Sequence, residues 1–343
     1  MSVPDAIDHR LQVLTRWLVE DLGFTDVRIT PASADASFRR YFRATRGEQT
    51  YIVMDAPPDK ENLQPFRKVA AMLAGFGLNV PRVLACYEAR GLLLLTDLGS
   101  QQYLDALAAN RDVDRLYADA LGALSTLQTA GRAHARLLPP YDGALLRREM
   151  ELLPEWFLHR HLAIEVGKAE RAMLDRLYEP LIGSALAQPV TFVHRDYHSR
   201  NLLISDAENP GILDFQDAVA GPITYDLASL LKDCYVAWPA ERVRAWVLRY
   251  RGELRQRGLD LPDENAFMRW FDLMGLQRHI KVLGIFCRLY YRDRKSQYLR
   301  DLPRVLEYVR SAAGAYPQTA EFAGFIAARV DAAFERAQAR ILA

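Results

Sequence analysis

The sequence predicts an α+β fold in which a small strand-rich region precedes a larger, mostly helical one. Apolar and polar residues alternate between residues 27 and 43, a pattern typical of half-buried strands, and the segments 83–87 and 92–95 flank a turn as in a hairpin. After Gly99 the composition shifts to helix-forming residues. Candidate helices lie near 112–137, 145–166 and 169–187. We therefore expect two domains, 1–97 around a small antiparallel sheet and 98–343 made mostly of helices.

Composition narrows the class of protein. The chain has 343 residues, 50% of them hydrophobic, so it can bury a substantial core, and its net charge is only +1. Such a charge gives no basic field that would attract nucleic acid or anionic membranes. The N-terminus lacks the basic-then-apolar layout of a signal peptide. We expect a cytoplasmic protein for which no nucleic-acid, membrane or protein partner is implied. Its three cysteines are expected to be buried reduced thiols: Cys86, Cys234 and Cys287.

Within the strand-rich region, each element has its own signal. Leucines recur at helical spacing between residues 11 and 22, and Gly23 then ends this leading helix. A loop at 31–37 is expected to separate the first two strands. Strands are expected over 27–29, 38–43, 51–54, 83–87 and 92–95, with a helix over 62–74.

The stretch from 191 to 217 carries the chemistry. It reads T-F-V-H-R-D-Y-H-S-R-N-L-L-I-S-D-A-E-N-P-G-I-L-D-F-Q-D, in which short apolar strand signals alternate with polar loops. Asp196 and Asp214 come after such strands and Asn201 comes directly before one, so the three side chains lie at strand ends and their oxygen atoms can converge. Mg²⁺ prefers oxygen ligands and takes only one or two carboxylates from a protein, which suits Asn201 and Asp214. Asp196 is then placed to align an acceptor hydroxyl and remove its proton.

Two other interpretations of this stretch stay open. Asp and Asn in loops are often turn formers or helix caps with no chemical role. His194 and His198 could also join Asp196 in a metal site like those of hydrolases, but only if residues 192–200 were helical, and the flanking residues favour strand then loop.

The spacing H-R-D-Y-H-S-R-N followed by Asp214-Phe215 matches the H-R-D-x-x-x-x-N and D-F-G pattern of protein kinases. With Asp226-Leu227-Ala228 further on, the stretch resembles the aminoglycoside phosphotransferase and choline kinase family, the small-molecule relatives of protein kinases. This resemblance implies a bilobal, protein-kinase-like fold that uses ATP and Mg²⁺. It also implies that His194 and Asp226 support the catalytic loop, although Asp226 could instead cap a helix.

In such a fold the loop between the first two strands covers the nucleotide phosphates. Loop 31–37 contains no glycine here, but its side chains are small, and Ser33 and Ser37 could donate hydrogen bonds to phosphate oxygens. The chain passes from the sheet lobe to the helical lobe near Gly99. By resemblance, the segment that contacts adenine is Thr96, Asp97 and Leu98.

The lysine that binds the phosphates in kinases is also missing, because its position on the third strand falls near Met54. The positive charge must then come from Lys60 or from Arg39 and Arg43, which share a strand face and could equally be exposed. The next helix has no clear glutamate to pair with such a cation, apart from Glu61 at its start.

A narrower set of motifs points to a class of acceptor. S-F-R-R-Y-F-R at 37–43, V-M-D-A-P-P at 53–58, L-L-L-L-T-D-L-G at 92–99 and L-Q-R-H-I-K-V-L-G-I-F at 276–286 are similar to bacterial kinases that phosphorylate the anomeric hydroxyl of N-acetylmuramate and N-acetylglucosamine in cell-wall recycling. The resemblance implies a sugar kinase. Alternatives are an aminoglycoside or choline-type kinase, or a nucleotide-binding regulator without phosphotransfer.

A basic stripe lies on the helix expected over 273–291. At 100° per residue, Gln277, Arg278, Lys281 and Arg288 fall in one sector of an otherwise apolar helix. The stripe could face solvent. The alternative, which the resemblance to sugar kinases allows, is that Arg278, Lys281 and Arg288 line the acceptor pocket.

Overall fold

The computed structural model describes residues 8–34, 38–206 and 208–342. Two compact units are formed. The first is Met1–Gln101 with Leu203–Asp217, and the second is Gln102–Leu202 with Ala218–Ala343. The predicted division at residue 97 left 203–217 with the second domain, and the structure differs at that segment.

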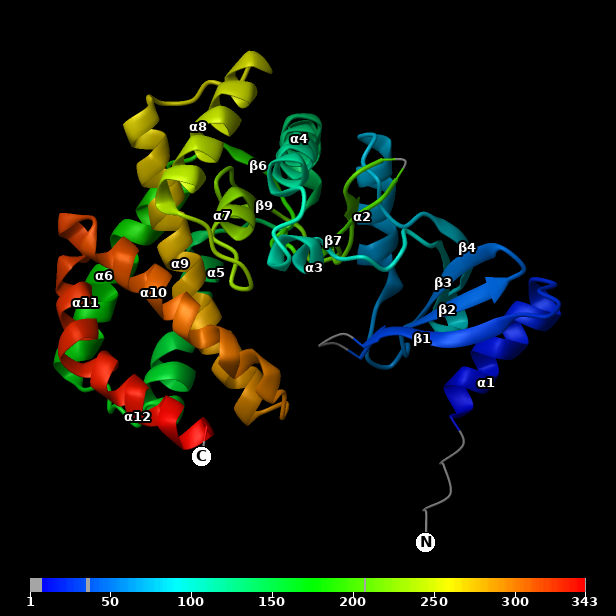
Figure 1. Ribbon diagram of the computed structural model, residues 1–343, viewed down its shortest axis with the longest axis horizontal. Helices are drawn as coiled ribbons and strands as arrows, with labels where there is room; N and C mark the ends of the chain where they lie inside the picture. Colours follow the sequence, from blue (N-terminus) through cyan, green and yellow to red (C-terminus); the bar gives the residue numbers. More distant parts are fainter. Residues whose placement is uncertain (1–7, 35–37, 207, 343) are drawn as a thin grey trace, which may run out of the picture. The chain divides into compact units, whose positions relative to one another are not determined.

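A five-stranded antiparallel sheet is the centre of the first unit (Figure 1). In sheet order the strands are β1 (Arg28–Ala34), β2 (Arg40–Arg46), β3 (Gln49–Asp55), β5 (Leu92–Thr96) and β4 (Val83–Tyr87). Helix α1 (His9–Arg16) packs on one face of this sheet, where Leu14, Phe42 and Val53 are buried together. This contact forms the core of the unit.

Alternation along β2 gives the sheet two different faces, because successive strand side chains point to opposite sides. Phe42 and Ala44 are buried in the core beside α1. Tyr41 and Arg43 therefore project to the other face, where Tyr41 lies opposite the buried Met54 of β3. The predicted lysine position is thus on the face away from α1, and an apolar side chain fills it.

The segment 203–217 returns to the first unit because its backbone and one aromatic ring bind there. The N–H of Ile212 donates to the carbonyl of Asn79 at 2.8 Å. Phe215 packs against Phe66 of α2 (Leu63–Gly75), with ring centroids 5.0 Å apart. The short strands of this hairpin are β7 (Leu202–Leu203) and β8 (Gly211–Ile212).

The second unit is mostly helical, with one antiparallel strand pair, β6 (Val190–Val193) and β9 (Val219–Pro222). Its helices are α3 (Tyr103–Ala108), α4 (Val113–Gly131), α5 (Gly143–Met150), α6 (Lys168–Leu186), α7 (Tyr225–Leu231), α8 (Ala240–Gln256), α9 (Glu264–Tyr291), α10 (Leu302–Gly314), α11 (Ala320–Phe325) and α12 (Asp331–Leu342).

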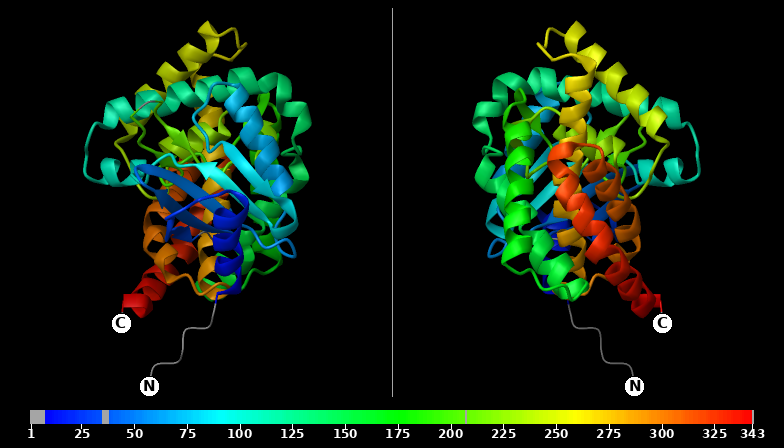
Figure 2. Two further views of the ribbon diagram at one scale, coloured as in Figure 1. Left: turned by 90° about the vertical axis from the view of Figure 1, so that its right-hand side faces the viewer. Right: turned by 90° about the vertical axis from the view of Figure 1, so that its left-hand side faces the viewer.

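Helix α9 runs through the middle of this unit and contacts α5, α6, α7, α8 and α10 (Figures 1 and 2). Seventeen of its 28 residues are buried. The segment before η4 (Leu153–His161) comes so close to α9 that a β-carbon added to Gly284 would collide with the backbone of Leu152. Only glycine fits this contact.

The predicted α+β class is confirmed. Three other predictions are wrong: the start of the first loop, the start of α9 and the burial of Cys86. Strand β1 runs to Ala34, so the loop expected to begin at residue 31 starts later, and Ser37 lies outside the described residues. Helix α9 begins at Glu264 because Asp263 caps it by accepting from the N–H of Ala266. Cys86 is exposed, since alternation along the edge strand β4 turns it outward. The other two cysteines are buried, and all three are free thiols.

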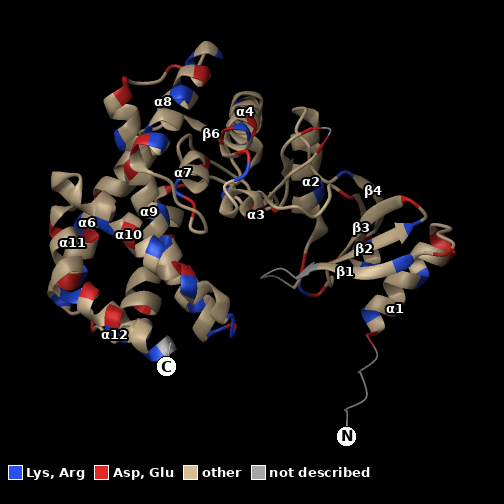
Figure 3. Cartoon of the chain, in the orientation of Figure 1, with Lys and Arg blue, Asp and Glu red and all other residues tan. Residues whose placement is uncertain are grey.

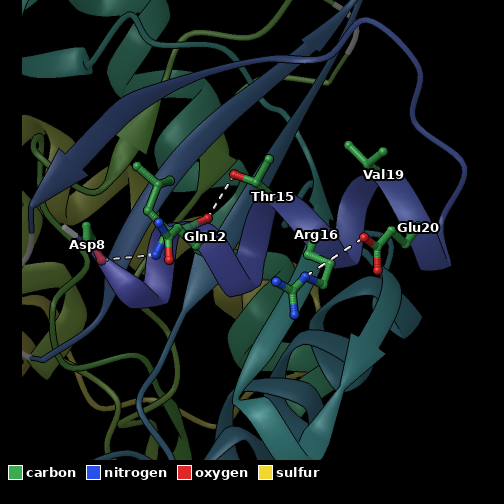
Figure 4. Close-up of a pocket in the computed structure, with 7 residues that line it drawn as sticks. Asp8, Gln12, Thr15, Arg16, Val19 and Glu20 are labelled. Atoms are coloured by element: carbon green, nitrogen blue, oxygen red, sulfur yellow. Dashed lines mark hydrogen bonds and ion pairs between the residues drawn. The ribbon is translucent and has the colours of Figure 1, made fainter.

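Charged residues of both signs are interspersed along the helices of each unit (Figure 3). Within the described ranges no helix is long and apolar enough to cross a membrane. A surface pocket on α1 is lined by that helix and its flanks alone (Figure 4). Its lining residues are Asp8, Leu11, Gln12, Thr15, Arg16, Val19 and Glu20. None of the predicted catalytic, metal-binding, nucleotide-binding or substrate-binding residues lines it.

Candidate active site

Asp226, at the start of α7, holds the beginning of the loop that follows β6. It is fully buried, and its two carboxylate oxygens accept hydrogen bonds from the backbone N–H groups of His194, at 2.7 Å, and Arg195, at 2.9 Å. Thr224, not Asp226, occupies the N-cap position of α7. Burial raises the pKa of Asp226 to about 7, against the lowering effect of the two N–H donors. The loop is therefore braced through its backbone.

Asp233, just beyond the other end of α7, holds the second half of the same loop. This buried carboxylate accepts from the N–H of Ser199 at 3.0 Å and from that of Tyr235 at 2.9 Å. Between the two braces, Arg195 adopts a left-handed backbone conformation with φ of 78°. Such a φ is uncommon for a residue other than glycine, and surrounding contacts must hold it. Asp226 is marked in the sequence by the motif Asp226-Leu227-Ala228, whereas no motif marks Asp233.

Asp196 lies between the braces and is ionised. Burial alone would raise the pKa of its carboxyl, but the charges of Lys281 and Arg278, followed by His198 and Arg195, lower it to about 2. His194 is fully buried, and its Nδ1 lies 3.3 Å from the N–H of Asp196. The loop thus presents a carboxylate that stays negatively charged and is fixed by its neighbours.

Arg195, Arg278 and Lys281 form a basic cluster beside Asp196. Arg278 donates to the carbonyl of Arg195 at 2.9 Å and to the hydroxyl of Tyr225 at 3.2 Å. Lys281 donates to the same hydroxyl at 2.9 Å. Arg278 is 4% exposed and Lys281 6%, so the alternative that these two face solvent is wrong.

Glu149 of α5 compensates part of this positive charge. One of its oxygens lies 2.6 Å from Nη2 of Arg195 and 2.9 Å from Nζ of Lys281. Its other oxygen accepts from the hydroxyl of Tyr141. Buried charges of one sign are energetically costly unless they are paired. Glu149 reduces this cost, but its single negative charge does not neutralise the three cations of the cluster. Because the carboxylate is shared by two cations, the cluster still lowers the pKa of Asp196.

Arg288 lies elsewhere. It is two turns further along α9, only half-buried, and interacts with Arg292, Asp293 and Glu155. Burial lowers the pKa of its guanidinium. The structure therefore brings Arg278 and Lys281 to Asp196, while Arg288 has a different set of charged neighbours.

Asn201 and Asp214, the predicted metal ligands, come from the two different units. The amide nitrogen of Asn201 donates to the carbonyl of Asp196 at 2.9 Å, so its oxygen is the atom that suits a metal ion. Asp214 has a left-handed φ of 62° and accepts from the amide of Gln216 at 2.7 Å. One carboxylate and one amide oxygen fit the ligand preference of Mg²⁺.

The hydrolase-like alternative is not supported. Throughout the described part of the chain, no three His, Cys, Asp or Glu side chains are grouped so that they could hold a metal ion. The ring of His194 packs on Tyr197 and that of His198 on Tyr235. Residues 194–201 form a loop rather than the helix that this alternative requires.

The residues predicted to contact nucleotide lie in the first unit. Arg43 binds Asp97 through two nitrogens, at 2.6 and 3.1 Å, and donates to the carbonyl of Gly99 at 3.0 Å. Thr96 accepts from the N–H of Arg82 through its hydroxyl, at 2.9 Å. Leu98 follows Asp97 in the chain and contacts Gly211. Ser33 lies on β1, and its side chain is not described.

An ionised carboxylate, fixed in a loop that two other carboxylates hold through its backbone, is the feature expected of a phosphotransferase. Residues 28–270 match the family model described as "Phosphotransferase enzyme family". The chain belongs to this family and is a kinase.

Curated relatives are similar over almost their whole length. N-acetylmuramate/N-acetylglucosamine kinase from Pseudomonas aeruginosa is 47% identical over 93% of this chain and 97% of its own. The enzyme of the same name from Neisseria meningitidis is 42% identical over 90% and 92%. These identities are high enough that the substrates of the relatives bear on the function proposed below.

Solved structures of low identity bear on the fold alone. A choline kinase from Streptococcus pneumoniae superposes with a TM-score of 0.61 at 12% identity, covering 88% of this chain and 99% of that one. An ADP-bound aminoglycoside phosphotransferase gives 0.57 at 15% identity, with 88% and 98% covered. The predicted protein-kinase-like fold is confirmed.

Several residues around Asp196 were not found from the sequence. Arg195 stands in the sequence only as part of the loop motif, and no pattern marks Tyr225. Glu149 and Tyr141 precede the loop by more than 40 residues, and no local pattern marks them. A buried lysine requires an anionic partner, so the burial of Lys281 would have indicated a nearby carboxylate. That burial, however, is known only from the structure.

Proposed function

We propose that this kinase transfers a phosphoryl group from ATP to the anomeric hydroxyl of an N-acetylated amino sugar, N-acetylmuramate or N-acetylglucosamine. The observation that carries the proposal is the ionised Asp196 beside the buried basic cluster. The names of the relatives at 42–47% identity support the same acceptors.

Asp196 would orient the acceptor hydroxyl and take its proton as the phosphoryl group is transferred. A carboxylate whose pKa is about 2 is a weak base. The anomeric hydroxyl suits such a base, because the adjacent ring oxygen withdraws electrons and makes this hydroxyl more acidic than other sugar hydroxyls. The oxygen–hydrogen bond of the acceptor breaks as its proton passes to Asp196, a bond forms between that oxygen and the γ-phosphorus, and the bond from this phosphorus to the bridging oxygen breaks, so that ADP leaves with that oxygen.

Mg²⁺, when bound with ATP, would neutralise charge on the transferring phosphates. Asn201 and Asp214 are the residues that we propose to hold it. Backbone bracing by Asp226 and Asp233 would keep Asp196 and Asn201 in fixed positions in the loop.

The basic cluster favours an acceptor that is neutral or anionic. Aminoglycosides and choline are cations, and a buried site with Arg195, Arg278 and Lys281 would repel them. N-acetylmuramate carries a lactyl carboxylate, which an arginine can hold through two parallel hydrogen bonds. Among acceptors of this family, amino sugars therefore fit this chain best.

An acceptor screen tests the proposal. ADP release would be measured with N-acetylmuramate, N-acetylglucosamine, choline and a set of aminoglycosides, and the position of the new phosphate would be read by ³¹P and ¹³C NMR. We expect turnover with the two sugars and a phosphate on the anomeric carbon. Turnover with choline or an aminoglycoside only, or a phosphate on another hydroxyl, would contradict it.

A further inference from the structure

The face of the sheet away from α1 needs a cation if nucleotide phosphates bind there, and its strand position is occupied by Met54. Three positively charged residues of the first unit are candidates: Lys60, Arg43 and Arg39. Their contacts differ enough to choose among them.

Lys60 is a surface residue. Its side chain is 52% exposed and makes a long ion pair of 3.7 Å with Asp59, which is itself 72% exposed. Its ammonium also lies over the ring of Phe38, 64% of which is exposed. Exposed pairs of this kind contribute little and hold a side chain weakly.

Arg43 already has a defined role. Its guanidinium binds both oxygens of Asp97 and the carbonyl of Gly99, and the N–H of Gly99 returns a hydrogen bond to Asp97 at 2.9 Å. These bonds tie the middle of β2 to the residues that follow β5. A guanidinium held this way fixes the end of the sheet, and moving it to a phosphate would break the turn at Gly99.

Arg39 has the properties that a phosphate-binding cation requires. It forms an ion pair with Glu61, just before α2, at 2.9 Å, and both side chains are only 12% exposed. Burial lowers the pKa of its guanidinium, but the effects of Tyr41, Glu61 and Asp217 together raise it above the ordinary value. Arg39 is therefore near Tyr41 on the face away from α1 and also near the turn that begins at Asp214.

Glu61 orients this arginine. Besides the ion pair, it accepts from the N–H of Phe38 at 3.3 Å, so it contacts both the backbone beside Arg39 and its side chain. A largely buried ion pair adds little to stability, because desolvation offsets the attraction, and it is better explained by a need for a charge at that place. The planar guanidinium can bind a carboxylate on one edge and phosphate oxygens on another.

We propose that Arg39, oriented by Glu61, is the residue that binds the ATP phosphates in place of the strand lysine. The cation would thus come from the residue before β2, and its carboxylate partner from a residue before α2. In protein kinases the lysine lies on the third strand and its glutamate within the following helix. This assignment rests on the proposed ATP dependence and makes no statement about the acceptor.

The experiment compares Arg39→Ala, Arg39→Lys and Glu61→Gln with Lys60→Ala as the matched control. Calorimetry would give the Kd of each protein for Mg-ATP and for adenosine, and steady-state assays would give KM for ATP and for N-acetylglucosamine. Thermal unfolding would check that each variant folds.

Arg39→Ala should raise the Kd and KM for ATP about 10- to 100-fold, the range for losing a hydrogen bond to a charged group, and leave adenosine binding and the sugar KM within about twofold. Arg39→Lys should restore part of the ATP affinity. Glu61→Gln should raise the ATP Kd by about 3- to 10-fold, and Lys60→Ala should not change it. Introducing Met54→Lys into Arg39→Ala should recover affinity, since it returns the charge to the same face.

Three results would overturn the assignment. One is an unchanged ATP Kd in folded Arg39→Ala. Another is an equal loss of ATP and adenosine binding with lower thermal stability, which would mean that the ion pair only orders the strand. The third is a loss in Lys60→Ala instead. Failure of the acceptor screen would not produce any of these results, because nucleotide binding is measured without the sugar.

Discussion

The two regions that carry the chemistry are built by different kinds of bond. The catalytic loop is held through its backbone, by the carboxylates of Asp226 and Asp233 at the two ends of α7. The part of the sheet where we propose that the phosphates bind is held through side chains, in the pairs Arg39–Glu61 and Arg43–Asp97. Hydrogen bonds to the backbone require a fixed spacing between the residues of the loop. A charged pair needs only that its two side chains meet, so its members can come from different positions in the sequence.

The largest expected effect separates chemistry from nucleotide binding. Asp196→Asn should lower kcat about 10²- to 10⁴-fold, because the acceptor hydroxyl loses its base, while the ATP Kd changes less than threefold. Arg39→Ala should give the reverse pattern. The comparison is checked by single-turnover kinetics and calorimetry on both variants. Asp196→Asn with full activity would mean that the loop has another role.

Next in size is removal of a brace. Asp233→Ala leaves the N–H groups of Ser199 and Tyr235 without their acceptor, so we expect it to lower the unfolding free energy by about 1–3 kcal/mol and kcat by about 10-fold or more. Asp226→Ala should do the same, because it also removes two backbone bonds. Urea unfolding and kcat would be measured together.

Asp142→Ala is the matched control for the braces. Asp142 caps α5 by accepting from the N–H of Leu145 at 2.9 Å, at the opposite end of that helix from Glu149, and its loss should cost about 1 kcal/mol of stability. We expect kcat to be unchanged in this variant. If Asp142→Ala lowered kcat as much as Asp233→Ala, the effect of the braces would be one of stability alone.

A third effect is a difference between two acceptors, without the loss of stability expected from removing a brace. Arg278→Ala and Lys281→Ala should reduce kcat/KM for N-acetylmuramate about 10- to 100-fold more than for N-acetylglucosamine, because only the first sugar has a carboxylate for the basic cluster. Arg288→Ala, from the same stripe but with different neighbours, should affect both sugars equally. Equal losses on both sugars in all three variants would leave the cluster with a structural role only.

These differences explain what could be predicted from the sequence. Local signals in the sequence indicate the α+β class and the order of the elements. They also indicate the motif of Asp196, Asn201 and Asp214, because a loop held through its backbone requires a fixed spacing. The return of residues 203–217 to the sheet, by contrast, depends on a distant carbonyl at Asn79. Glu149 meets Lys281 across 132 residues of chain, a pairing that no periodicity encodes. The sequence predicted that a cation must replace the strand lysine, but contacts were needed to choose Arg39.

The smallest expected effect concerns pH. In the native protein Lys281 and Arg278 hold the pKa of Asp196 at about 2, against burial, which would raise it above the ordinary value of 3.8. Lys281→Met removes the larger of these two lowering charges, and Glu149 stays paired with Arg195. The pKa of Asp196 should then rise, so that more of the carboxyl is protonated as the pH falls.

Activity should respond on the acid side only. We expect the ratio of kcat/KM at pH 5 to that at pH 8, measured with N-acetylglucosamine, to fall about twofold in Lys281→Met relative to the wild-type protein, and further when Arg278→Met is added. Arg176→Ala, which breaks an exposed ion pair with Glu321, should leave the ratio unchanged. A ratio that also stayed constant in the Lys281 variant would mean that the basic cluster does not control the ionisation of Asp196. The burial of the basic cluster would then have to be explained by acceptor binding alone.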